Sequence, residues 1–275
     1  VYWHIPRTGG TTTKYIISHC LSLVETNQIG ITNGHGEEDV LQVLSIAGGR
    51  YVNVDTTTQA GIARAREMNL TQSGLVDIII TPYLHDIATL FDNDTPDSNK
   101  TIKCFTMLRH PIDRAVSMFH TLQDAAKQHS PSSSLSAFQN TSIVEYANSN
   151  LSEENWMVRY LTNEMVNPLS WSHLQLAMKI LGNKFIVGLF DQFEESIQRF
   201  DQYFGWDRIE PVQNRTTCEE YLIDNWLTTT PDDAEIVEKG TEAWKLLEVK
   251  NAYDIILYEY ATKLFARQTS VFINN

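Results

Sequence analysis

The chain has 275 residues, of which 42% are hydrophobic and 20% are charged, so it can bury a full core and differs from a disordered chain. Its 21 basic and 34 acidic residues give a formal net charge of −13, which excludes a general nucleic-acid binder. Its 3 cysteines exclude a disulfide framework and allow one bridge at most, and the spacing of cysteines and histidines matches no zinc pattern. We therefore expect no bound metal.

Short apolar runs alternate with helical patterns along the chain, which predicts an α/β protein with a mainly parallel central sheet. No internal repeat or interdomain linker interrupts this pattern. We therefore expect a single domain that covers residues 1–275. The runs expected to form strands are residues 1–5, 51–54, 76–81, 102–108 and 185–190.

Four amphipathic patterns predict helices between and after these strands. The first helix follows a Gly-Thr turn, and its apolar face runs from Ile16 to Val24. The second begins at Pro111, because proline suits the first turn of a helix. The third has Asp191 as its N-cap and ends at Gly205. The last helix has an apolar face made of Tyr253, Leu257, Tyr260 and Leu264.

The turn after the first strand carries an anion-binding pattern in residues 4–13, His-Ile-Pro-Arg-Thr-Gly-Gly-Thr-Thr-Thr. Glycines let the backbone approach a ligand, the start of a helix presents N–H groups, and hydroxyls and one cation complete a phosphate cradle. The pattern differs from the nucleoside-triphosphate loop, because its cation precedes the glycines and no Lys-Ser/Thr pair follows them. The alternative is a Gly-Thr turn that only caps a helix.

A second pattern begins at Arg109, where the strand of residues 102–108 ends. Open α/β sheets bind ligands at this edge, and Ser117 lies about 12 Å further along the following helix at 1.5 Å per residue. A phosphate beside the first turns of that helix could contact both side chains. The alternative is that Arg109 only pairs with Asp113.

Together, the two patterns resemble those of the sulfotransferases that use 3′-phosphoadenosine-5′-phosphosulfate (PAPS), especially the membrane-anchored Golgi carbohydrate enzymes such as the heparan sulfate 2-O- and 6-O-sulfotransferases. Residues 154–161, 185–190 and 254–265 are also similar to this family. The resemblance implies a P-loop-like sulfotransferase fold, a three-layer α/β sandwich, with PAPS as co-substrate and no metal. It implies Arg7, Thr8, Gly9, Gly10, Thr11 and Thr12 for the 5′-phosphosulfate, Arg109 and Ser117 for the 3′-phosphate, and Arg215 and Thr216 for a loop that covers the nucleotide.

The resemblance also locates the general base near the end of the strand of residues 76–81. Relatives carry a catalytic His there, and the matching position in this chain is Ile80. We therefore expect His85, which follows the same strand end, to be the base, with Arg7 as the catalytic cation. His35, in a glycine-flanked loop, is the alternative base.

These features predict an enzyme that transfers a sulfuryl group from PAPS to a hydroxyl of a carbohydrate. A net charge of −13 does not favour a polyanionic acceptor, so a neutral glycan or a small hydroxylated metabolite is an alternative, as is a non-catalytic nucleotide-binding protein on the same fold. The family's usual location and the Asn-x-Ser/Thr sequons predict residence in the Golgi lumen, with a membrane anchor ahead of Val1 and glycan on at least one sequon. The 6 sequons are at Asn69, Asn93, Asn99, Asn140, Asn150 and Asn214.

Overall fold

The computed structural model describes residues 1–91, 102–128, 134–208, 215–229 and 237–273. A seven-stranded sheet in the order β3-β4-β2-β5-β1-β6-β7 runs through it, and its pairs are parallel except for the antiparallel β3–β4 hairpin. The α/β prediction with a mainly parallel sheet is therefore confirmed. The strands are β1 Tyr2–Trp3, β2 Val24–Thr26, β3 Val43–Ile46, β4 Gly49–Val52, β5 Ile78–Thr81, β6 Cys104–Leu108 and β7 Phe185–Leu189.

Helices cover both faces of this sheet, because its strands bury side chains in both directions. On β5, Ile78 and Ile80 belong to a buried cluster with η1, α9 and α10, whereas Ile79 belongs to a cluster with α2 and α3 on the other face. That second face is continued by α7, α8 and α12, which pack against Trp3 and Val187. The helices on the sheet are α1 Gly10–Tyr15, η1 Ile16–Cys20, α2 Gln59–Glu67, α3 Leu70–Ser73, α7 Trp156–Thr162, α8 Trp171–Lys184, α9 Phe193–Phe204, α10 Arg215–Thr229 and α12 Ala252–Ile273.

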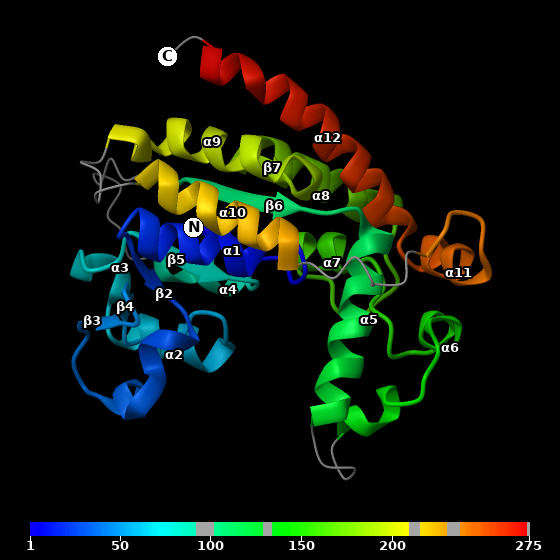
Figure 1. The fold of residues 1–275 in the computed structure, drawn as a ribbon, viewed down its shortest axis with the longest axis horizontal. Helices are drawn as coiled ribbons and strands as arrows, with labels where there is room; N and C mark the ends of the chain where they lie inside the picture. The colour runs from blue at the N-terminus through cyan, green and yellow to red at the C-terminus, as the bar shows by residue number, and fades with distance from the viewer. Residues whose placement is uncertain (92–101, 129–133, 209–214, 230–236, 274–275) are drawn as a thin grey trace.

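A separate helical region extends from one end of the sheet. Figure 1 shows α5 running downward from the sheet to α6, with α11 beside its upper part. Ile112 and Phe119 of α5 bury their side chains there against Tyr146 of α6 and Leu247 of α11. The bounds are α5 Pro111–Gln128, α6 Ile143–Asn148 and α11 Glu242–Lys250, and the short elements elsewhere are α4 Leu84–Ala88, η2 Gln28–Glu37, η3 Thr89–Phe91, η4 Ser134–Phe138, η5 Phe190–Gln192 and η6 Trp206–Arg208.

The first crossover differs from the prediction. Val24, which the apolar pattern put on the first helix, instead begins β2. The helix runs from α1 into the π-helical turn η1, and Ser22 then adopts a left-handed conformation (φ 52°) that ends it. The β3–β4 hairpin was also not predicted; its turn has positive φ at Ala47 (50°) and Gly48 (89°), as a two-residue hairpin turn requires.

The later helices follow the prediction more closely. Pro111 begins α5, and Gly205 ends α9 in a left-handed conformation (φ 71°). The N-cap prediction is wrong: residues 190–192 form the turn η5, Gln192 is the N-cap, and the Asp191 carboxylate instead accepts a hydrogen bond from Tyr258 Oη at 3.1 Å. Within α12, Leu257 and Leu264 are buried as their spacing predicts.

Candidate anion-binding site

The turn that follows β1 lies at the middle of the sheet. β1 is hydrogen-bonded in parallel to β5 and β6, so the turn after Trp3 emerges at the carboxyl edge, between the ends of its two neighbours. Arg7 (φ 69°) and Gly9 (φ 79°) both have left-handed backbone conformations, and α1 begins at Gly10. This tight turn into a helix is the geometry expected of the anion-binding pattern.

Two glycines allow the turn to pack closely on its surroundings. A Cβ atom on Gly9 would lie 2.6 Å from Phe193 Cε2, and one on Gly10 would overlap the His4 ring. The Gly-Gly pair is therefore required by the packing of Phe193 and His4 against the turn.

The threonines of the turn serve two purposes. Thr8 is fully buried and its Oγ1 donates to the Ile5 carbonyl oxygen at 2.9 Å, so this hydroxyl holds the turn itself. Thr13 Oγ1 donates in the same way to the Gly9 carbonyl oxygen at 3.1 Å. Thr11 is exposed and Thr12 is buried. The exposed Thr11 hydroxyl is therefore free of the packing that engages Thr8.

The second pattern lies against the first. Arg109 follows β6, the neighbour of β1, and its Nη1 donates to the Arg7 carbonyl oxygen at 3.4 Å. In the other direction, Arg7 Nε donates to Ser117 Oγ of α5 at 3.0 Å. Two segments that are 110 positions apart in sequence therefore bring two guanidinium groups and a hydroxyl together at the carboxyl edge of the sheet.

The surroundings of Arg109 keep it available for an anion. Its guanidinium lies 4.2 Å from the centre of the Phe190 ring, and burial lowers its pKa, an effect that the nearby Asp113 and Asp191 oppose. It makes no ion pair with Asp113 among the described contacts, and the Asp113 carboxylate lies 3.8 Å from His110 Nδ1 instead. The simple Arg109–Asp113 pair offered as an alternative is therefore not formed.

The two candidate bases are both engaged in hydrogen bonds. His85, in α4, bonds through Nε2 to the Leu161 carbonyl oxygen at 3.0 Å, which makes Nε2 the protonated nitrogen and leaves Nδ1 as the basic one. His35 in η2 bonds through Nδ1 to Glu38 Oε1 at 2.9 Å. Ile80 is fully buried. The choice of His85 as the base stays a prediction.

Arg215 and Thr216 are the first two residues of α10, and their side chains lie outside the described part of the structure. The start of this helix lies at the end of η1, ten residues beyond Gly10, because Cys218 forms a disulfide with Cys20. This is the one bridge that 3 cysteines allow, and Cys104 is free. A role for Arg215 and Thr216 at the turn stays a prediction.

A further group of titratable residues was not singled out from the sequence. His4 of the turn, Lys14 of α1 and Glu25 of β2 interact electrostatically. Burial lowers the pKa of His4 to about 4 and raises that of Glu25 to about 8, while the Lys14 charge lowers both values. Burial also lowers the pKa of Lys14. The sequence signal for this group is the pair of charged residues, Lys14 and Glu25, inside segments that are otherwise apolar.

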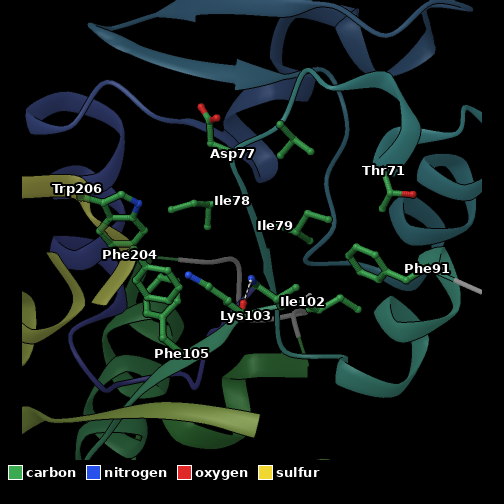
Figure 2. A pocket seen from close by; sticks show the side chains of 12 residues that line it. Thr71, Asp77, Ile78, Ile79, Phe91, Ile102, Lys103, Phe105, Phe204 and Trp206 are labelled. Atoms are coloured by element: carbon green, nitrogen blue, oxygen red, sulfur yellow. Dashed lines mark hydrogen bonds between the residues drawn. The ribbon is translucent and has the colours of Figure 1, made fainter. Parts of the chain in front are cut away.

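A cavity of about 300 Å³ lies at the opposite edge of the sheet, where β5 and β6 begin. Figure 2 shows Phe105, Phe204 and Trp206 on one side of it and Thr71 and Phe91 on the other. Because open α/β sheets bind their ligands at the carboxyl ends of the strands, this cavity is separate from the candidate site.

In comparisons with known proteins, no protein-family model, curated protein or solved structure matches the chain. Within the described residues, no group of three or more His, Cys, Asp or Glu side chains is arranged to hold a metal ion. None of the described helices has the length and apolar character needed to cross a membrane.

Proposed function

We propose that this protein is a sulfotransferase with a P-loop-like fold, which transfers a sulfuryl group from PAPS to a hydroxyl of a carbohydrate acceptor. The observation that carries the proposal is the Arg7–Ser117 hydrogen bond of 3.0 Å, which joins the two anion-binding patterns at one edge of the sheet. A donor with phosphate groups at both the 5′ and 3′ positions needs two such anion sites side by side.

The residues present fit this donor. The turn of residues 4–9 and the start of α1 offer backbone N–H groups, and Gly9 and Gly10 let this turn pack tightly against Phe193 and His4. Arg7 would hold the 5′-phosphosulfate, together with Thr8 through its backbone, and Arg109 and Ser117 would hold the 3′-phosphate. Guanidinium groups suit this task because they stay charged and bind phosphate oxygens in a fork.

The reaction would be an in-line transfer. A base accepts the proton of the acceptor hydroxyl, the new oxygen–sulfur bond forms, and the bond from sulfur to the bridging phosphate oxygen breaks, so that its electron pair leaves with the 3′,5′-bisphosphate. Arg7 and the N–H groups of the turn would stabilise the charge that develops on the leaving phosphate. His85 would accept the proton through Nδ1, since its Nε2 donates to the Leu161 carbonyl oxygen.

Composition and exposure support the proposed acceptor and location. A net charge of −13 favours a neutral glycan over a polyanionic one. The sequon residues Asn69, Asn140 and Asn150 are all exposed, which supports residence in the Golgi lumen, where glycosylation would occur.

A non-catalytic nucleotide-binding protein is the second candidate, and a specific observation favours it. The position at which relatives carry a catalytic His is the fully buried Ile80, and both His85 and His35 already have hydrogen-bond partners. Such a protein would keep Arg109 and Ser117 for the bisphosphate and would transfer no sulfuryl group.

Ligand-induced thermal stabilisation tests the proposal. The 3′,5′-bisphosphate of adenosine should stabilise the protein far more than AMP does, and without added magnesium, because only the bisphosphate occupies both anion sites. Equal stabilisation by the two nucleotides would remove the 3′-phosphate site and the proposal with it.

A further inference from the structure

The cations around the turn lie on two sides of it. Arg7 is on the α5 side, where its Nε donates to Ser117 Oγ at 3.0 Å. Arg109 is on the same side, because it follows β6 and stacks on Phe190, next after β7. No residue of the sulfotransferase-like patterns supplies a cation on the other side, toward β5 and β2.

Lys14 supplies a cation on that side. It is four residues after Gly10 in α1, so both occupy one face of the helix, and a helical side chain extends toward the helix start. One helical turn separates Lys14 from Gly10, where the His4 ring occupies the space of a side chain, so an extended Lys14 side chain can reach the turn, and its charge lowers the pKa of His4 in addition to the larger effect of burial. Among the described residues, the Lys14 side chain has no hydrogen bond and no ion pair within 4.0 Å.

Glu25 lies behind Lys14. It is only 1% exposed, in the middle of β2, and its Oε1 accepts a hydrogen bond from Asn27 Nδ2 at 2.8 Å. Its Oε2 has no hydrogen-bond partner in the described part of the chain, although leaving a buried carboxyl oxygen unpaired is costly. The charged and titratable groups around this carboxyl are Lys14 from α1, Tyr2 from β1 and Tyr51 from β4. Asp55, which follows β4, interacts with Lys14.

We propose that Lys14 is a second cation of the donor site, which contacts the transferring sulfuryl group from the β2 side, and that Glu25 is the positioning residue that holds it. This inference rests on the proposed function. In this arrangement the unpaired Oε2 would accept a hydrogen bond from the ammonium group, which lies more than 4.0 Å from it in the structure. Arg7 then serves the phosphate and Lys14 the sulfuryl group, so the two ends of the 5′-phosphosulfate have separate cations.

The test compares binding of PAPS without acceptor with binding of the 3′,5′-bisphosphate, which lacks the sulfuryl group. Lys14→Met should weaken PAPS binding by about 10-fold, the loss expected for one charged hydrogen bond, and bisphosphate binding by less than about threefold. Lys14→Arg keeps the charge and should restore most of the PAPS affinity. An equal effect of Lys14→Met on both ligands, or no effect on either, would overturn the inference.

Glu25→Gln, which preserves shape, gives a second and independent readout. In the wild type, PAPS affinity should fall as the pH rises through about 8, because Glu25 then gains a negative charge beside an anionic ligand. Glu25→Gln should remove this fall, and an unchanged pH profile would overturn the positioning role. If the wild-type protein binds neither ligand, the proposed function itself is overturned. If Arg109→Ala loses bisphosphate binding while Lys14→Met binds both the bisphosphate and PAPS as the wild type does, only this inference is overturned.

Discussion

Arg109→Ala tests the second anion site most sharply. In the structure, the Arg109 guanidinium lies 4.2 Å from the Phe190 ring centre. Among the described residues its only hydrogen bond is the long one of 3.4 Å to the Arg7 carbonyl oxygen, so the substitution removes few internal contacts. The main loss should be one charged hydrogen bond to the 3′-phosphate, about 1.5–3 kcal/mol, which corresponds to about 10- to 150-fold in affinity.

Isothermal calorimetry with two nucleotides measures this loss. The affinity for the 3′,5′-bisphosphate should fall by the stated factor, while the affinity for AMP, which has no 3′-phosphate, should stay within about twofold of the wild type. Arg66→Ala, on the exposed surface of α2, is the matched control and should change neither value. An unchanged bisphosphate affinity, or an equal loss for both nucleotides, would refute the reasoning and return Arg109 to a structural role.

Four sets of residues give the remaining predictions. His85→Ala should preserve bisphosphate affinity and lower turnover by about 10²-fold, and near-normal turnover together with a large loss in His35→Ala would transfer the role of base. Gly10→Ala should lower the unfolding free energy by about 1–3 kcal/mol in chemical denaturation, because the added Cβ would overlap the His4 ring. The double variant Gly10→Ala/His4→Ala should recover part of the lost stability, and full stability of Gly10→Ala alone would contradict the close packing of Gly10 on His4. Burial raises the pKa of Glu25 to about 8 in the folded state, so proton binding by Glu25 stabilises the folded protein at low pH, and this stabilisation is lost as the pH rises toward 8. The stability of the wild type should therefore fall relative to that of Glu25→Gln over this interval. Parallel pH curves would be inconsistent with the burial of Glu25. Protein made in its own cells should lose mass on glycosidase treatment, and no loss would count against a lumenal location; the exposed acceptors are Asn69, Asn140 and Asn150.

Local patterns predicted the parts of the fold that are long or strongly apolar. The run before Arg109 and the helix from Pro111 are present as β6 and α5, because a buried parallel strand is apolar throughout and proline favours a helix start. β2 was not predicted because it has only three residues, Val24–Thr26, and its middle residue is a glutamate. Its burial depends on β4 and β5, which pair with it from distant positions in the sequence.

The candidate site also has parts that local sequence patterns predict and parts that they do not. The turn of residues 4–13 and the Arg109 pattern could each be found locally, but the contact between them joins residues 110 positions apart and depends on β1 and β6 being neighbours. The position of Lys14 and Glu25 behind the turn could not be predicted, since it requires β2 to lie on the far side of β5. The β3–β4 turn does have a local sequence signal, Gly48, which is one of its two residues with positive φ.

Transfer of labelled sulfur from PAPS tests the central claim most directly. Wild-type protein is incubated with PAPS labelled at the sulfuryl group and a panel of neutral glycans, sulfated glycans and small hydroxylated metabolites, with Arg7→Ala as the inactive control. We expect label to appear in at least one acceptor, most strongly in a neutral glycan, with equal release of the 3′,5′-bisphosphate and no requirement for metal. Bisphosphate binding that is intact while no acceptor in the panel gains label would contradict the claim of a transferase and favour the non-catalytic nucleotide-binding protein.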